Sequence, residues 1–256
     1  MEKLIAELKR LYLIDQPGAP HTSDLAAHLR GETTIRIDLA DENGMARALV
    51  LEFHKTRDDA HWQRLCEVAN ALQHDLGLPA PAVSVSGGSS YGLWLSFEAP
   101  LPPAQLREFH ALLHKAYFGD EEVDFGKTMV ELPPCRHRET GLWAAFINPG
   151  MGASFAEELG LEMTPPIGAQ SQFLEGLRSI TAKELAHAFD MLQAKVDGDV
   201  AALAQPALAP TPASQTTPSN KAGDTSPGLL LKDASIEDIV RHLQARNIEP
   251  TLRFLK

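Results

Sequence analysis

Apolar and polar residues alternate over the first 30 positions with the period of an α-helix. An apolar stripe at intervals of three and four residues predicts a helix of about three turns, formed by Leu4, Ile5, Leu8, Leu11 and Tyr12. Pro17 and Gly18 end this helix, because both residues interrupt helical structure. A second, shorter helix is expected over residues 24–29, with Thr22 or Ser23 as its N-cap.

Residues 35–39 and 45–54 carry apolar side chains at every second position, which is typical of half-buried strands. Between them lies Asn43-Gly44, a pair that favours the tight turns of hairpins. The pattern therefore predicts an antiparallel hairpin. Because successive side chains of a strand point to opposite faces, one face of the second strand carries Leu49, Leu51 and Phe53, and the other carries Val50, Glu52 and His54.

Residues 62–76 return to the helical period, and a second hairpin follows them. Gly77 closes this helix, and Pro79 prevents its continuation. Residues 83–97 then consist of two apolar runs joined by Gly87-Gly88-Ser89-Ser90. Because glycine adopts positive φ at little cost, this connection is typical of a tight reversal between antiparallel strands.

The pattern from there to about residue 200 alternates helices with strands and ends in helices. Thr181 to Glu184 form a capping-box pattern that opens the last helix. Strands interspersed with helices indicate one α+β (α/β) domain over residues 1–202. The expected elements before the last helix are a helix over 106–116, strands over 128–132 and 142–147 around a turn-rich segment (133–141), and helices near 155–159 and over 168–178.

Two further segments follow this domain. Residues 203–228 are rich in Pro, Ala, Thr and Ser, a composition that cannot bury enough apolar surface to offset the entropy of ordering, so we expect a disordered linker. Residues 229–256 carry an apolar stripe that follows Ser235 and predicts a small helical module. Because about 28 residues cannot hold a core of their own, we expect this helix to dock on the domain, on a second copy or on another protein.

The chain of 256 residues has a formal net charge of −11 and a pI near 5.3. Non-specific adhesion to nucleic acid comes mainly from Lys and Arg, which displace counterions from phosphates. The acidic balance therefore opposes such adhesion, and a nucleic-acid site would have to be a local patch. A short basic run, Arg136-His137-Arg138, is a candidate for part of that patch.

The two cysteines, Cys66 and Cys135, are isolated and have no metal-binding or disulfide-framework spacing. This usage fits a reducing cytoplasm. No window approaches the roughly 18 consecutive apolar residues of a membrane span, and the N-terminal residues lack the pattern of a cleavable signal. We therefore expect a soluble cytoplasmic protein without a membrane partner.

The central hairpin carries a motif. Ser86-Gly87-Gly88 is followed, after two residues, by Tyr91-Gly92-Leu93-Trp94. This segment resembles the second motif of the archaeo-eukaryotic primase superfamily, the primase-polymerases. In that motif Ser-Gly-Gly leads into an apolar strand through a basic residue and a histidine. Here Ser89 stands at the basic position and Gly92 stands at the position of the histidine.

Two more segments are similar to the other motifs of this family, in the same order along the chain. The family's Asp-x-Asp pair on a strand falls here on Glu52 and His54. Asp124, after an apolar residue, resembles the third motif. Residues 133–141 are similar to the loop that follows that motif, with Glu139 in place of its lysine. Three motifs in the family's order are more specific than any one of them.

The resemblance covers residues 45–147 and implies an RRM-like sheet with flanking helices as the catalytic core. It also implies Mg²⁺ or Mn²⁺ as a cofactor, since nucleotidyl transfer needs cations that neutralise the triphosphate. The implied catalytic and metal-binding residues are Glu52, His54 and Asp124. The implied contacts to nucleotide or nucleic acid are Ser86, Gly87, Gly88, Ser89, Ser90, Arg136, His137 and Arg138.

Three functions are compatible with these residues. The loss of one carboxylate and of the motif-two histidine predicts a catalytically impaired primase-polymerase-like protein. It would bind nucleotide or nucleic acid as an accessory in the replication or maintenance of DNA, including that of a mobile element. The first alternative is an active metal-dependent nucleotidyltransferase with a Glu/His/Asp site. The second alternative is a protein-interaction adapter that acts through residues 229–256, which the overall acidity favours over nucleic-acid binding.

Overall fold

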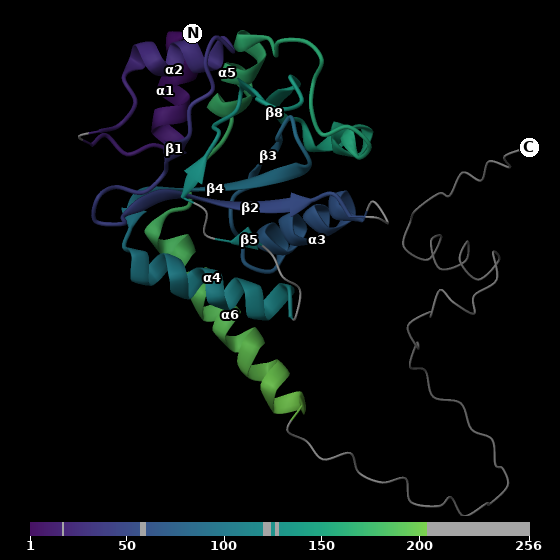
Figure 1. Ribbon diagram of the computed structural model, residues 1–256. Coiled ribbons are helices and arrows are strands. Elements are labelled where there is room, and N and C mark those ends of the chain that lie inside the picture. The colour runs from purple at the N-terminus through teal and green to yellow at the C-terminus, as the bar shows by residue number, and fades with distance from the viewer. Residues whose placement is uncertain (17, 57–59, 120–123, 126–127, 204–256) are drawn as a thin grey trace, which may run out of the picture. The chain divides into compact units, whose positions relative to one another are not determined.

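A six-stranded antiparallel sheet organises the described part of the chain (Figure 1). The computed structural model describes residues 1–203 except 17, 57–59, 120–123 and 126–127, and for residues 124–125 and 199–203 it describes the backbone alone. The strand order is β5-β2-β4-β3-β8-β7. The strands are β2 (Ala46–His54), β3 (Ala82–Val85), β4 (Ser90–Leu101), β5 (Asp124–Phe125), β7 (Cys135–Arg136) and β8 (Trp143–Ile147).

Four of these strands and two helices form a β-α-β-β-α-β unit. Helix α3 (His61–His74) connects β2 to β3, and helix α4 (Pro103–Tyr117) connects β4 to β5. The order β5-β2-β4-β3 places the first and third strands of the unit side by side in its middle. This is the split β-α-β arrangement. The prediction of a mixed domain of strands and helices is confirmed.

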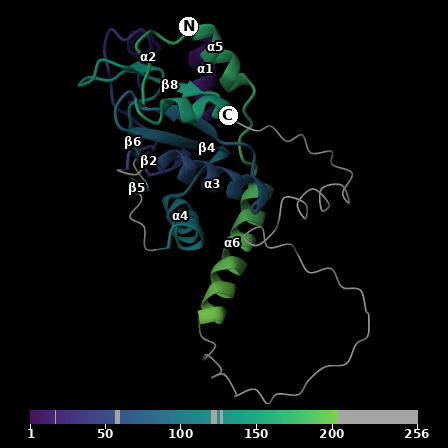
Figure 2. The ribbon, with the colours of Figure 1, turned by 90° about the vertical axis from the view of Figure 1, so that its right-hand side faces the viewer.

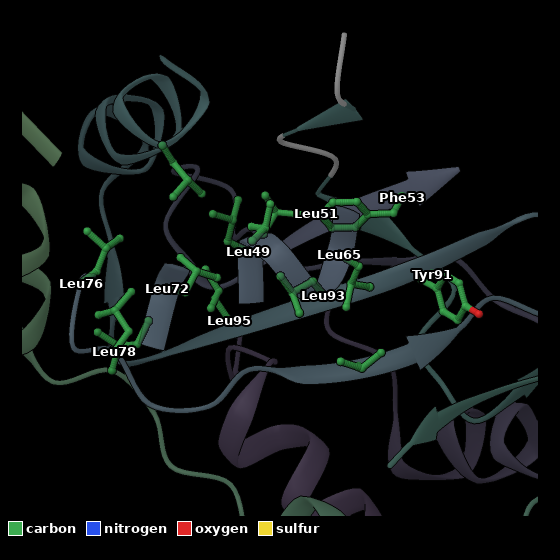
Figure 3. Close-up of a cluster of buried hydrophobic side chains, with 14 of the residues drawn as sticks. Leu49, Leu51, Phe53, Leu65, Leu72, Leu76, Leu78, Tyr91, Leu93 and Leu95 are labelled. Atoms are coloured by element: carbon green, nitrogen blue, oxygen red, sulfur yellow. The ribbon is translucent and has the colours of Figure 1, made fainter. Parts of the chain in front are cut away.

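Helices α3, α4 and α6 (Ala182–Leu203) cover one face of the sheet (Figures 1 and 2). The β2 residues Leu49, Leu51 and Phe53, which were expected to share a face, all belong to the buried cluster on this side (Figure 3). Each fully buried side chain of this size contributes about 1.5–3 kcal/mol. Apolar packing therefore holds these helices on the sheet, through partners that include Leu65, Leu72, Leu93 and Leu95.

Helices α1 (Glu2–Leu11), α2 (Thr22–Leu29) and α5 (Ile167–Glu175) lie on the opposite face (Figure 1). Tyr12, just after α1, is buried against Trp94 and Phe146, with ring centroids 5.1 and 5.8 Å away. This cover stops before the end of β2. There the side chains of Glu52 and His54 are 25% and 51% exposed. One end of the sheet is therefore accessible from this side.

The predicted hairpin of residues 35–39 with 45–54 is wrong in its pairing. Strand β1 (Ile37–Asp38) pairs instead with β6 (Met129–Val130) in a separate two-stranded sheet. In the described residues the chain before the turn meets β2 through a single bridge, Ala40 to Ala46. The physical reason is a long-range partner: Ile37 and Asp38 pair with Val130 and Met129, which follow about 90 residues later in the chain, in place of the neighbouring residues of β2.

Two shorter segments also differ from expectation. The helix expected near residues 155–159 is replaced by an earlier 3₁₀ helix, η1 (Pro149–Phe155), in which the Asn148 side chain accepts a hydrogen bond from the Gly150 amide at 2.9 Å. The turn-rich segment 133–141 contains the short strand β7, because Cys135 and Arg136 pair with β8. Two residues are too few for an alternating pattern to reveal a strand.

The C-terminal part of the prediction remains open. Helix α6 extends to Leu203, the first residue of the expected linker. The rest of the linker (204–228) and the predicted helical module (229–256) lie outside the described residues, so the division into domains stays a prediction. Within the described residues, no helix combines the length and apolar character needed to span a membrane.

A buried histidine ties α2 to the segment that leads into β7. The His28 side chain is fully buried; its Nε2 lies 2.8 Å from the Leu132 carbonyl, and its Nδ1 accepts from the Ile35 amide at 3.1 Å. One donor and one acceptor on the ring correspond to neutral imidazole. Burial lowers the pKa of His28 below its ordinary value of 6.5, although the Leu132 hydrogen bond opposes this shift.

We expect the protein to lose stability as the pH falls below 6.5, because the unfolded chain then binds a proton that folded His28 resists. Substitution His28→Gln should reduce this pH dependence and lower the free energy of unfolding near neutral pH by about 1–3 kcal/mol. Urea unfolding followed by circular dichroism at about pH 7.5 and about pH 5.5 measures both effects. The exposed His187→Gln on α6 is the control. An unchanged pH dependence in His28→Gln would contradict the assignment.

Candidate functional site

A pocket of about 470 Å³ lies over the accessible end of the sheet. Glu52 of β2, the Gly/Ser connection between β3 and β4, and His137 after β7 all contribute to it. The fold therefore brings together parts of all three motif regions. The lining residues are Arg36, Val50, Glu52, Ser84, Ser86, Gly88, Ser89, Ser90, Gly92, Trp94, Met129, Val130, Glu131, Pro133 and His137.

The central positions of the three motifs lie on one row across the sheet. Glu52 pairs directly with Gly92 on β4 and, along its other edge, with Asp124 on β5. Ser84 continues the row on β3, opposite Gly92. For Asp124 this statement concerns the backbone, which is the part of that residue that the structure describes. Three segments that are distant in the sequence are therefore neighbours on adjacent strands.

Two carboxylates line the pocket, and the sequence pointed to one of them. The Glu52 carboxylate lines the pocket and lies 3.6 Å from Nε2 of His54. His54 itself is not among the lining residues. Glu131 also lines the pocket, and its carboxylate lies 3.9 Å from Nε of Arg36. No motif marks Glu131 or Arg36, because both reach the pocket through the pairing of β1 with β6.

The described side chains do not complete a metal site. Among them, no three His, Cys, Asp or Glu residues converge as metal ligands would. Glu52 and Glu131 are hard oxygen donors of the kind that Mg²⁺ and Mn²⁺ prefer, but two carboxylates alone do not form such a group. The predicted ligand set that includes Asp124 stays a prediction, since the side chain of Asp124 lies outside the description.

The Gly/Ser connection uses its own hydroxyl to satisfy its amides. Oγ of Ser86 accepts hydrogen bonds from the amides of Gly88 and Ser90, both at 3.1 Å. Gly87 has a φ of +72°, and its amide donates to the Leu159 carbonyl at 2.7 Å. These three amides are therefore not available to a ligand. The residues of this connection that line the pocket are Ser86, Gly88, Ser89 and Ser90, so three hydroxyl-bearing residues contribute to its wall.

His137 is held in place against the two glycines. A Cβ at Gly87 would lie 2.9 Å from the Cβ of His137, and one at Gly88 would lie 3.0 Å from its Nε2. The Thr140 amide donates to Nδ1 at 3.3 Å, and the Thr140 hydroxyl donates to the Gly87 carbonyl. Because Nδ1 accepts, neutral His137 carries its proton on Nε2. The ring thus offers a fixed N–H donor at the pocket wall.

Arg136 and Arg138 line a different hollow from the first pocket. This hollow, of about 320 Å³, shares His137 with the first pocket. Arg136 Nε donates to the Gly141 carbonyl at 3.1 Å, and Arg138 donates to the Thr34 carbonyl. Both acceptors are neutral carbonyl groups, so these two hydrogen bonds do not neutralise the positive charge of either guanidinium. The predicted basic patch is therefore divided between two neighbouring hollows.

The glycine at the position of the motif-two histidine is required by its neighbours. Nε1 of Trp94 donates to Oγ of Ser84 at 2.8 Å, next to Gly92. A Cβ at Gly92 would lie 2.7 Å from Oγ of Ser84 and 2.8 Å from Nε1 of Trp94. Both distances are shorter than a Cβ contact tolerates. The indole–hydroxyl pair thus fills the space that a side chain at position 92 would enter.

Comparisons with known proteins leave the family of the chain open. No family model matches the sequence, and no curated protein matches it. Among solved structures, the fold is similar to the archaeo-eukaryotic primase domain of the primase-polymerase from cyanophage S-2L. The two chains are 17% identical with a TM-score of 0.38, over 68% of this chain and 97% of that one. These values are too low to assign the chain to that family.

We expect Gly92→Ala to lower the free energy of unfolding by about 1–3 kcal/mol, because the added methyl group overlaps the Ser84–Trp94 pair. Chemical denaturation of the purified variant measures this. The matched control is Gly168→Ala in α5, where an added Cβ would meet no atom within 4 Å. Equal stability of the two variants would show that the space beside Gly92 is not filled as described.

Proposed function

We propose that the pocket binds a phosphate of a nucleotide or of single-stranded nucleic acid, and that the chain is a primase-polymerase-like protein with impaired catalysis. In this proposal it acts as an accessory in the replication or maintenance of DNA. The observation that carries the proposal is the row of Asp124, Glu52 and Gly92 on adjacent strands, which sets three motif positions side by side at the pocket.

The composition of the pocket suits a nucleotide. Its volume of about 470 Å³ is in the range of small-molecule sites. The guanidinium of Arg36, the hydroxyl of Ser86 and the Nε2–H of His137 can each donate to a phosphate oxygen. Met129, a pocket residue that is 49% exposed, offers apolar surface to a base or sugar. Val50 and Trp94 also line the pocket but are 3% and 4% exposed.

We assign the phosphate to one side of the pocket on electrostatic grounds. Carboxylates repel a phosphate, so we assign the phosphate to the side of His137 and away from Glu52. The neighbouring hollow supplies two more cations, Arg136 and Arg138, and shares His137 with the pocket. A strand with one phosphate at His137 can then present its next phosphate to these arginines.

Catalysis is impaired in this proposal because two groups of the family's motifs are missing. Gly92 cannot make the phosphate contact of the motif-two histidine. His54 replaces a carboxylate, which removes negative charge needed to hold two cations. Each loss is expected to reduce the rate of nucleotidyl transfer by a factor on the order of 10² or more.

We expect Arg36→Gln and His137→Ala each to weaken the binding of a fluorescent deoxynucleoside triphosphate by roughly tenfold, the worth of one charge-assisted hydrogen bond. Fluorescence anisotropy at low ionic strength measures this. Lys115→Gln, an exposed change on α4, is the control for net charge. The proposal fails if the wild-type chain binds neither the nucleotide nor a labelled oligonucleotide, or if the control loses as much affinity as the two variants.

A double variant tests whether the ligand is a single nucleotide or a nucleic-acid strand. Arg136→Gln with Arg138→Gln should weaken the binding of single-stranded oligonucleotide roughly tenfold and leave the binding of the mononucleotide unchanged. The same anisotropy measurement, repeated at higher salt, should show a smaller salt dependence in the double variant. Equal affinity of wild type and double variant for the oligonucleotide would restrict the site to nucleotides.

The direct pairing of Glu52 with Asp124 favours one alternative, an active metal-dependent nucleotidyltransferase. Extension of a labelled primer in Mn²⁺ distinguishes this alternative from an impaired protein. Incorporation that Asp124→Asn and Glu52→Gln both abolish would identify the enzyme. Incorporation no greater than in a protein-free control would support impaired catalysis.

A further inference from the structure

A second cavity, of about 820 Å³, lies at the other end of β2 from Glu52. Four parts of the fold meet there: the last turn of α1, the connection that follows it, the first residues of α2 and the first residues of β2. Its lining residues are Lys9, Arg10, Leu13, Ile14, Asp15, Gln16, Gly18, Ala19, Pro20, His21, Thr22 and Arg47.

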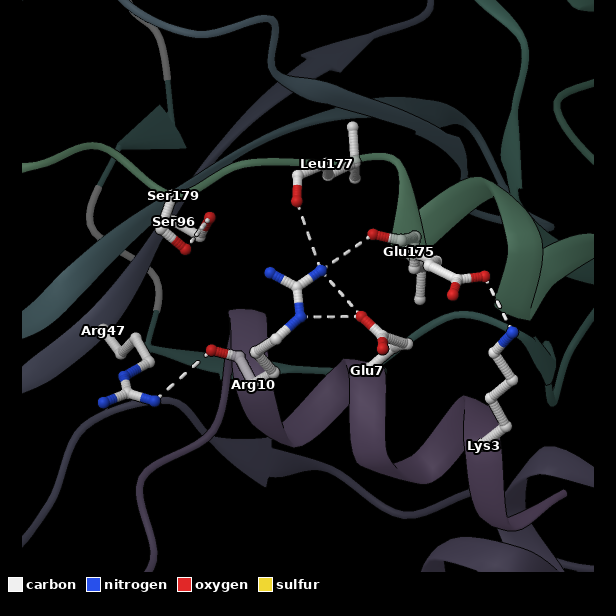
Figure 4. Close-up of polar contacts among 9 residues, drawn as sticks. Lys3, Glu7, Arg10, Arg47, Ser96, Glu175, Leu177 and Ser179 are labelled. Atoms are coloured by element: carbon white, nitrogen blue, oxygen red, sulfur yellow. Dashed lines mark hydrogen bonds and ion pairs between the residues drawn. The ribbon is translucent and has the colours of Figure 1, made fainter.

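The charges around this cavity are mostly positive, although the chain as a whole is acidic. Lys9, Arg10 and Arg47 face a single carboxylate, that of Asp15. Arg10 is already engaged by Glu7 at 2.6 Å, by the carbonyl of Leu174 in the last turn of α5 and by that of Leu177 just after it (Figure 4). Within the described part of the chain, Lys9 and Arg47 form no ion pair. These two cations therefore remain to neutralise a ligand.

Arg47 is held at the cavity by the backbone around it. It lies between the buried Ala46 and Ala48, where the register with β4 shifts. Nη1 of Arg47 donates to the Arg10 carbonyl at 3.3 Å (Figure 4), which satisfies an acceptor at the end of α1. Its Nε is buried and has no hydrogen-bond partner. The Arg10 carbonyl thus accounts for one N–H of the guanidinium, and other N–H groups of Nη1 and Nη2 remain to donate to a ligand in the cavity.

The start of α2 adds amide donors to the same cavity. His21 is the N-cap of α2 and makes no side-chain capping bond, and Thr22 is the first helical residue. The first amides of a helix have no intrahelical acceptor, and the helix dipole favours negative charge at this end. Helix amides and two cationic side chains that line one cavity form the arrangement that binds oxyanions in proteins.

We propose that this cavity is a second anion site, separate from the pocket over the sheet, and that it binds a compact phosphoryl group of diphosphate size. Arg47 and Lys9 supply the charge, and the first amides of α2 supply further donors. Either a free diphosphate or the terminal phosphate of a nucleic-acid strand has this chemistry. The site does not depend on the function proposed for the first pocket.

Calorimetric titration of the full chain with inorganic pyrophosphate, at constant ionic strength set with chloride, tests the proposal. We expect binding that Arg47→Gln and Lys9→Gln each weaken roughly tenfold. Lys183→Gln on α6 is the matched control for charge and should bind like wild type. Because the first pocket is proposed to bind phosphate as well, Arg47→Gln is also titrated in an Arg36→Gln background, where it should still weaken the binding of pyrophosphate roughly tenfold. Arg47→Lys, which keeps the charge and loses the planar donor set, should fall between Arg47→Gln and wild type.

Several results would overturn this assignment. One is that the wild type does not bind pyrophosphate, and another is that Arg47→Gln and Lys9→Gln both bind it as tightly as the wild type does. A third is that the control Lys183→Gln loses as much affinity as these two variants, and a fourth is that Arg36→Gln loses affinity while they do not. Because Lys9 is exposed on α1, Lys9→Gln keeps the test valid if Arg47 variants fold poorly. Competition by a 5′-phosphorylated oligonucleotide, but not by its dephosphorylated form, identifies a strand end as the source. Competition by neither form identifies a free diphosphate.

Discussion

Strand β2 is the element on which the fold and both candidate sites depend, because both of its edges and both of its faces are in use. β4 and β5 occupy its edges. One face carries the apolar residues that hold α3 to the sheet, and the other passes under the N-terminal helices before it emerges at Glu52. β1 does not continue along β2 and pairs instead with β6. This displacement brings Arg36 and Glu131 to the wall of the first pocket.

The sequence predicted correctly which residues share one face of a strand, because that depends on local periodicity. It did not predict which strands pair, because that depends on segments distant in the chain. The alternation at Leu49, Leu51 and Phe53 indicated correctly which residues share a face, since a period of two is a property of one strand. The Asn43-Gly44 turn suggested a hairpin because a turn motif carries no information about partners that are distant in the sequence. The actual partner of β1, β6, has two residues, too few to show any alternation.

The candidate site was predictable to the same extent. The order of the motifs anticipated that Glu52, Ser86 and His137 would line one pocket. It did not anticipate that Arg136 and Arg138 would line the next hollow without reaching the first. The local backbone gives the reason: β7 ends at Arg136 and a turn begins at Arg138, so the three residues do not lie along one strand face. Arg36 and Glu131 could not be found, since they join the pocket through a long-range pairing.

The Ser84–Trp94 hydrogen bond limits the paths that sequence change can take. A histidine at position 92 needs the volume that the indole and the hydroxyl now fill. A single substitution at position 92 is therefore not enough, because Trp94 or Ser84 must also become smaller, and either change by itself leaves a void or an unsatisfied donor. The packing beside Gly92 couples positions 84, 92 and 94, so that larger residues at position 92 are tolerated only together with a change at one of the other two.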